Sequence, residues 1–297
     1  MQHQGVEIED TFAEAFPMVG ARVIVTAISP QWARTAADMA TGYGTSVISC
    51  DAEAGIESDV SAAQTPDGRP GVSFLVFGFS REGLAKALVG RVGQCVMTCP
   101  TTCCYDGLTG SEKRVRVGGA LRYFGDRYQT SKLLEGRRYW RMPVMDGEFV
   151  CEDEFGTARG VGGGNFLVLG QTQEQTLAAA ERAVAAIADV PNVICPFPGG
   201  IVRSGSKVGS SYPKLKASTN DAYCPTLRGM VESSLPDSVN AVYEVVIDGL
   251  DIESVERATR VGVSAACGEG IVRISAGNYG GKLGPHHFRL RELMKSQ

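Results

Sequence analysis

The hydrophobic positions of the chain repeat one pattern four times: an apolar strand, an amphipathic helix and a second apolar strand. We expect opening strands at 21–29, 72–80, 164–170 and 241–250, and closing strands at 44–50, 93–99, 192–197 and 270–276. Each pair encloses about one helix, so each is a candidate crossover unit with parallel outer strands. Loops at the ends of such strands often carry binding groups.

Four helices are expected between these strands, at 30–41, 81–91, 171–190 and 251–267. Thr172 and Asp251 are suited to cap the last two helices, because their side-chain oxygens can accept hydrogen bonds from free amides of the first turn.

Two crossover units in sequence can form a split arrangement, in which an antiparallel sheet carries both helices on one face. We therefore predict an α+β chain with two similar ferredoxin-like α/β sandwich lobes. The N-terminal lobe would span 1–148 and the C-terminal lobe, with Gly-rich binding loops, 149–297. Residues 114–150 carry the turn signals Glu135-Gly136 and Asp146-Gly147, which predict antiparallel hairpins. We assign these hairpins to the first lobe as an extension of its sheet; the alternative is that they cover the joint between the two halves. One continuous doubly wound sheet would not easily accommodate these hairpins.

Composition indicates an ordinary soluble protein, with 43% hydrophobic and 21% charged residues in 297. The net charge of −4 argues against a nucleic-acid partner. No stretch approaches the roughly 18 apolar residues of a membrane helix, and the N-terminus shows no export signal. We therefore expect a cytoplasmic protein with no membrane partner.

Cys95, Cys99, Cys103 and Cys104 form a cluster without CxxC spacing, and the chain has only three histidines. This spacing does not favour a metal site. We expect these cysteines to be packing residues, with Cys95 and Cys99 in a closing strand.

The loop at 196–209 resembles a phosphate-binding loop, but Ser206 separates Gly205 from Lys207, and Pro213 interrupts the expected helix. Its glycines can instead expose amides that bind oxyanions, with Arg203 and Lys207 supplying charge. A tight solvent-exposed loop is the alternative.

A second Gly-rich loop at 274–284 follows an equivalent strand, and a polar segment lies at 216–226. Together these loops predict a shared binding cleft. The candidate binding residues are Gly199, Gly200, Arg203, Ser204, Lys207, Thr219, Asn220, Asn278, Tyr279 and Lys282.

Glu244 lies inside the apolar strand AVYEVVIDGL. A buried carboxylate is costly unless it is paired or protonated, and burial would raise its pKa towards the range useful for proton transfer. The alternative is that Glu244 is exposed or paired with an arginine.

Several long segments of the chain resemble formylmethanofuran:tetrahydromethanopterin formyltransferases, nearly from end to end. These segments are GVEIEDTFAEAF (5–16), TPDGRPGV (65–72), GQCVMTCPT (93–101), PFPGGIVRSGSKVG (196–209), STNDAYCPT (218–226) and ISAGNYGGKLG (274–284). The resemblance implies formyl transfer between methanofuran and tetrahydromethanopterin as substrates, with no bound prosthetic group, in a dimer or tetramer. The catalytic carboxylate of the family matches Glu244.

Residues 136–149, 162–170 and 284–290 look closer to bacterial, methylotroph-type members. In those organisms the protein is a subunit of a formyltransferase/hydrolase complex. The resemblance then implies that formyl-tetrahydromethanopterin donates to a methanofuran-type coenzyme, with the product hydrolysed by a partner subunit.

We expect transfer through a tetrahedral intermediate without a covalent enzyme adduct, because no Ser–His or Cys–His pair is evident. Glu244 would carry the proton, donors from the Gly-rich loops would stabilise the oxyanion, and Arg203, Lys207 and Lys282 would hold anionic coenzyme tails. The alternative function is a non-catalytic pterin-binding or scaffold subunit.

Overall fold

The computed structural model describes residues 1–295, which fold into two compact units. Unit 1 combines Met1–Pro17 with the chain from Val161 onward, and unit 2 is Met18–Gly160. These units differ from the expected lobes, because the first 17 residues join the C-terminal part of the chain. The cause is β2 (Val6–Ile8), which pairs in parallel with β17 (Ile271–Ser275).

Unit 2 has the predicted split arrangement. Its strands and helices follow one another as β3 (Phe12–Thr26, from Met18), α1 (Pro30–Thr41), β4 (Glu53–Val60), β5 (Gly71–Gly78), α2 (Arg81–Arg91) and β6 (Cys103–Asp106). The antiparallel sheet has the order β4-β5-β3-β6. The two strands of each crossover unit are therefore parallel to each other, with an antiparallel strand between β3 and β4.

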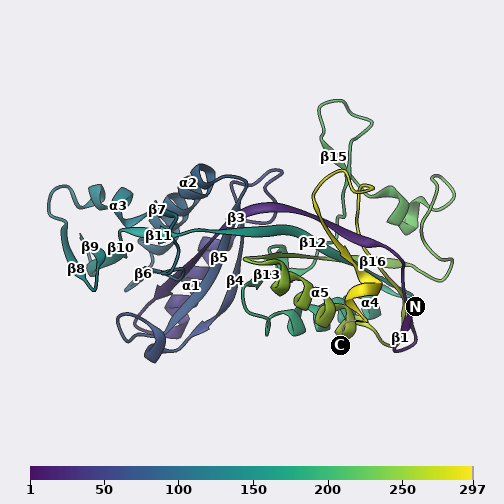
Figure 1. Cartoon of the computed structure of the whole chain (residues 1–297), viewed down its shortest axis with the longest axis horizontal. Helices are drawn as coiled ribbons and strands as arrows, with labels where there is room; N and C mark the ends of the chain where they lie inside the picture. The colour runs from purple at the N-terminus through teal and green to yellow at the C-terminus, as the bar shows by residue number, and fades with distance from the viewer. Residues whose placement is uncertain (296–297) are drawn as a thin grey trace. The chain divides into compact units, whose positions relative to one another are not determined.

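Unit 1 repeats this arrangement (Figure 1). Its elements are β12 (Ala158–Gly170), α4 (Gln173–Ile187), β13 (Val193–Ile194), β16 (Ala241–Gly249), α5 (Ile252–Ala266) and β17. The antiparallel order is β13-β16-β12-β17, to which β2 and then β1 (Gln2–His3) are added. The predicted mixed α/β architecture with two similar lobes is confirmed.

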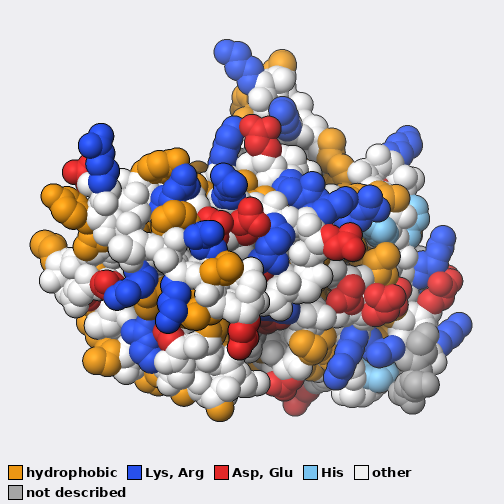
Figure 2. Space-filling view, turned by 60° about the vertical axis from the view of Figure 1, so that its left-hand side comes forward, with side chains coloured by type: hydrophobic (Ala, Val, Ile, Leu, Met, Phe, Trp, Pro, Cys, Tyr) orange, Lys and Arg blue, Asp and Glu red, His pale blue; other side chains and the backbone are white. Residues whose placement is uncertain are grey.

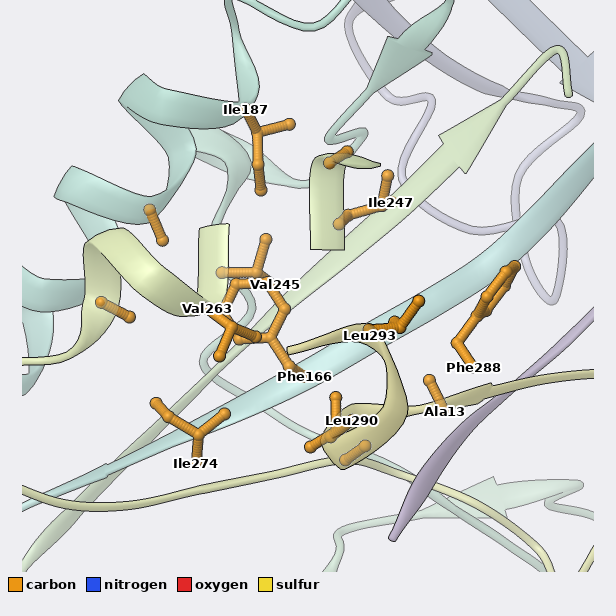
Figure 3. Packing of buried hydrophobic residues seen from close by; sticks show 14 of the residues in the cluster. Ala13, Phe166, Ile187, Val245, Ile247, Val263, Ile274, Phe288, Leu290 and Leu293 are labelled. Carbon is orange, nitrogen blue, oxygen red and sulfur yellow. The ribbon is translucent and has the colours of Figure 1, made fainter. Parts of the chain in front are cut away.

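The core of unit 1 lies between its sheet and helices α4 and α5. Phe166, Val245 and Ile247 point from the strands towards Ile187 and Val263 of the helices (Figure 3). Fully burying each such side chain contributes about 1.5–3 kcal/mol. The predicted caps are present, because Thr172 accepts from the Gln175 amide and Asp251 from the Ser254 amide.

Two of the expected closing strands are wrong. Residues 44–50 contain no strand, and the closing strand of this crossover unit is instead β4. β4 pairs with β5 alone, and its polar sequence suits such a position at the edge of the sheet. Residues 93–99 continue α2 through a π-helical turn at Val92–Val96. A short apolar run does not distinguish a buried strand from a buried helical segment.

The cysteine cluster of unit 2 packs against its core. Cys95 and Cys99, expected in a strand, lie in and after the π-helical turn and are half-buried. Cys103 and Cys104 are buried in β6.

The predicted hairpins extend the sheet of unit 2. They consist of β8 (Thr130–Leu134), β9 (Arg137–Val144) and β10 (Gly147–Glu152), with β10 parallel to β6. Other short elements of unit 2 are η1 (Ala62–Gln64), β7 (Arg114–Arg116), α3 (Gly118–Leu121), η3 (Arg122–Gly125) and β11 (Glu154–Gly156). Unit 1 ends with β18 (His286–Arg289) and α6 (Leu290–Leu293).

A long irregular segment joins β13 to β16 and covers the face of the unit 1 sheet that has no helices. Leu235 and Val239 of this segment pack on Leu167 and Leu169 of β12. Around β15 the segment extends away from the unit 1 sheet (Figure 1). Its elements are η4 (Pro198–Gly200), β14 (Lys207–Val208), β15 (Ala217–Ser218), η5 (Asp221–Tyr223) and η6 (Pro225–Leu227).

The surface carries acidic and basic side chains interspersed with hydrophobic ones on the face shown in Figure 2. In the described part of the chain, no helix is both long and apolar enough to span a membrane.

Candidate active site

A cavity of about 500 Å³ lies in unit 1 between the sheet and the covering segment. Five of the residues expected from the sequence line it: Arg203, Ser204, Thr219, Asn220 and Glu244. The floor comes from β12 and β16, and the walls come from the loops after β13. A cavity of this size is in the usual range for small-molecule sites.

Glu244 points into this cavity from the middle of β16. Its strand neighbours Tyr243 and Val245 are buried, and Val245 lies in the core under the helices, so the alternation of the strand places Glu244 on the opposite face. Burial raises the pKa of the Glu244 carboxyl to about 7. No group within residues 1–295 donates a hydrogen bond to this carboxylate, so no donor offsets the rise in its pKa that burial causes.

The loop after β13 is held beside Glu244 by backbone pairing. The Val202 amide donates to the Glu244 carbonyl at 2.7 Å, and the Glu244 amide donates to the Val202 carbonyl at 3.0 Å. Because Arg203 and Ser204 follow directly, both reach the cavity. They also line a second hollow of about 440 Å³, whose other walls are Phe197, Pro198 and Ile201.

Lys207 does not line the cavity and binds the Asp221 carboxylate at 2.5 Å. The hydrogen bond from Lys207 lowers the pKa of Asp221. The cation expected to hold a coenzyme tail therefore already has a partner in the polar segment.

Gly199 and Gly200 also lie outside the cavity lining, and both have positive φ, 62° and 78°. A Cβ on Gly200 would lie 2.6 Å from Val184 Cγ1, so glycine is required there for close packing on α4.

The second Gly-rich loop, residues 277–284, is fastened to the N-terminal residues. Asn278 Nδ2 donates to Thr11 Oγ1 at 3.0 Å and to the Phe12 carbonyl at 3.2 Å. The Tyr279 hydroxyl donates to the Ser206 carbonyl at 3.2 Å, and Lys282 is exposed. Four amides of this loop, expected to bind a substrate oxyanion, donate to the Glu14 carboxylate instead.

Sequence reasoning missed several polar side chains at the cavity. Gln173 Nε2 donates to the Tyr243 hydroxyl at 3.3 Å, and the Tyr223 hydroxyl lies 3.2 Å from Ser275 Oγ. All of these except Ser275 line the cavity. The sequence offers one signal for the two tyrosines, which is their position along the chain. Tyr223 lies within the polar segment 216–226, and Tyr243 is adjacent to Glu244.

Two family models together match nearly the whole chain. Residues 1–144 match the model described as formylmethanofuran-tetrahydromethanopterin formyltransferase, and residues 147–293 match its proximal lobe. The formyltransferase of Methylococcus capsulatus is 56% identical, with 98% of each chain covered. A subunit of the formyltransferase/hydrolase complex of Methylorubrum extorquens is 52% identical, covering 98% of this chain and 96% of that one.

Solved structures show the same similarity. The formyltransferase from Methanosarcina barkeri superposes with a TM-score of 0.94 at 49% identity, covering 99% of this chain and 100% of that one. A chain of the Methylorubrum extorquens complex, solved with methylofuran, gives 0.96 at 51% identity, covering 99% and 98%.

Proposed function

Because the chain belongs to the formylmethanofuran–tetrahydromethanopterin formyltransferase family, we propose that it performs its formyl transfer at the cavity floored by Glu244. The enzyme moves a formyl group between a methanofuran-type coenzyme and tetrahydromethanopterin, which are its substrates. The observation that carries the site assignment is a carboxylate with a pKa of about 7 and no hydrogen-bond donor among the described residues, facing this cavity.

The transfer proceeds by direct attack of one coenzyme nitrogen on the formyl carbon held by the other. The new C–N bond forms as the carbonyl electrons move to oxygen, which gives a tetrahedral intermediate. Glu244 accepts the proton from the attacking nitrogen and delivers it to the leaving nitrogen, and the old C–N bond then breaks. A pKa near the working pH suits a group that both accepts and donates.

The oxyanion of this intermediate requires a hydrogen-bond donor. Since Glu14 occupies four amides of loop 277–284, we assign this role to donors on the cavity wall, among them Ser204 and Asn220. Arg203, which borders both hollows, supplies positive charge for an anionic part of a coenzyme.

The assembly of this chain is inferred from a bacterial relative. Because the matching subunit of the Methylorubrum extorquens complex is 52% identical, we infer that this chain also joins hydrolase subunits and forms homo-oligomers in the cytoplasm. The direction would then be from formyl-tetrahydromethanopterin to the methanofuran-type coenzyme, whose product a partner hydrolyses.

The test is formyl transfer by the purified chain without partners, followed in both directions. Turnover that depends on Glu244 supports the proposal. A chain that binds the pterin but transfers no formyl group would instead be a scaffold subunit. Mass determination after co-purification tests the assembly separately.

A further inference from the structure

Glu14 is a second carboxylate that lies inside an apolar strand of unit 1, and the mechanism above leaves it without a role. It belongs to the FAEAF segment of β3 and is 2% exposed. Its two oxygens accept hydrogen bonds from the backbone amides of Tyr279 (2.8 Å), Gly281 (3.1 Å), Gly284 (2.9 Å) and Leu283. Backbone amides that converge within a Gly-rich turn can form an anion-binding concavity, and here the anion is the chain's own carboxylate.

The turn is also fixed against β3 by its backbone. β18, which follows the turn, pairs with β3 so that His287 lies opposite Glu14. A Cβ on Gly284 would lie 2.1 Å from the Ala15 carbonyl oxygen, so only glycine permits this approach. Burial alone would raise the pKa of Glu14, but the four amides lower it, which keeps the carboxylate charged at neutral pH.

The same turn reaches the Glu244 side of the sheet. The Gly277 amide donates at 2.6 Å to Oδ1 of Asn165, whose position on β12 is two residues from Leu167, the partner of Glu244. Tyr279 then contacts the Ser206 carbonyl in the loop that pairs with Glu244 through Val202. Burial raises the pKa of the Tyr279 hydroxyl, and the nearby charge of Glu244 raises it further.

We propose that Glu14 is a positioning residue for formyl transfer: it holds the 277–284 turn so that Tyr279 bridges to Ser206 and closes one side of the Glu244 site. Glu14 touches no substrate and acts through the turn. This inference rests on the proposed role of Glu244.

Glu14→Gln is the diagnostic change because it keeps the shape of the side chain. A carboxamide has one acceptor oxygen, and its NH₂ group would face two of the four amide donors. The turn would loosen, Tyr279 would leave Ser206, and the access of water to Glu244 would increase. The pKa of Glu244 would then fall towards the ordinary glutamate value.

The experiment compares the wild-type chain with Glu14→Gln and with Glu7→Gln, a control at a 43% exposed carboxylate that binds Arg273. Hydrogen exchange at the amides of Tyr279 and Gly281 is measured along with kcat, KM and the pH profile. Glu14→Gln should speed exchange at these amides, lower kcat about tenfold or more, and move the acid limb of kcat/KM down by about half a pH unit. Glu7→Gln should change none of these.

Loss of stability alone would lower the amount of active enzyme without moving the acid limb. Unchanged amide exchange, or an acid limb that stays in place, overturns the proposal. If Glu14→Gln does not fold, Tyr279→Phe tests the bridge with the turn intact: an unmoved acid limb overturns the proposal, and a downward shift supports it. Full turnover in Glu244→Gln would refute the catalytic assignment, whereas amide exchange reports on the turn without any turnover.

Discussion

Val202 and Glu244 exchange both of their backbone hydrogen bonds, at 2.7 and 3.0 Å, although Val202 belongs to an irregular loop. This pairing continues the edge of the sheet beyond β13 and joins the first Gly-rich loop to the strand that carries the candidate proton carrier. It explains why Arg203 and Ser204 face the same cavity as Glu244.

Glu244→Gln should lower kcat by about 10²–10⁴ in both directions, because the amide cannot carry the proton between the two nitrogens. Steady-state assays with each formylated coenzyme measure the effect. Glu181→Gln, an exposed change on α4, is the matched control and should keep full activity. A loss smaller than about tenfold would contradict the assignment.

The acid limb of kcat/KM should lie near pH 7, since the carboxyl of Glu244 has a pKa of about 7 and must be ionised to accept a proton. Activity should therefore rise as the pH increases from 6 to 8. A profile that is flat over this interval would show that another group carries the proton.

Glu244→Gln should also stabilise the fold at alkaline pH. The folded carboxyl binds its proton up to about pH 7, whereas an unfolded glutamate releases it near 4.5. The wild-type chain is therefore favoured below pH 4.5 and loses up to about 3 kcal/mol as the pH rises through 7. Urea unfolding at pH 5 and pH 8 should show a gain for the variant that is larger at pH 8.

Lys207→Ala should leave kcat and the KM for both coenzymes nearly unchanged, because Lys207 lies outside the cavity lining and is already paired with Asp221. Asp221→Asn keeps the cation but removes its partner, so it should leave KM equal or lower it. Parallel measurement of both variants separates a binding role from a purely structural ion pair, for which both changes would affect stability alone.

Asp251→Ala should destabilise the chain by about 1 kcal/mol without altering kcat. Asp251 caps α5 by accepting from the Ser254 amide at 2.7 Å, and this amide would lose its partner. Chemical denaturation measures the change in the free energy of unfolding. Glu253→Gln, an exposed change in the same helical turn, provides the comparison.

The sequence was sufficient wherever the local signal was specific. The caps at Thr172 and Asp251 and the two-lobed arrangement were all predictable, because capping oxygens and strand–helix alternation act locally. The strand predicted at 93–99 is wrong because Val92 and Val96 are buried on a helical turn, and their spacing also fits a short buried strand.

The site was only partly predictable for a different reason. Glu244 is predictable because a carboxylate interrupts an apolar strand, and Glu14 in the segment FAEAF carries the same signal. The partner of Glu14 lies about 265 residues further along the chain, so no local pattern shows that its carboxylate would occupy the amides of loop 277–284.

The pairing of β2 with β17 has a consequence for the order in which the chain is made. All of unit 2 leaves the ribosome before the strand that receives β2 has been synthesised. Residues 1–17, with Glu14 among them, must therefore wait for the last part of the chain. If the gene were divided at its midpoint, β2 and Glu14, which lies in β3, would be on a different fragment from their partners β17 and the 277–284 turn.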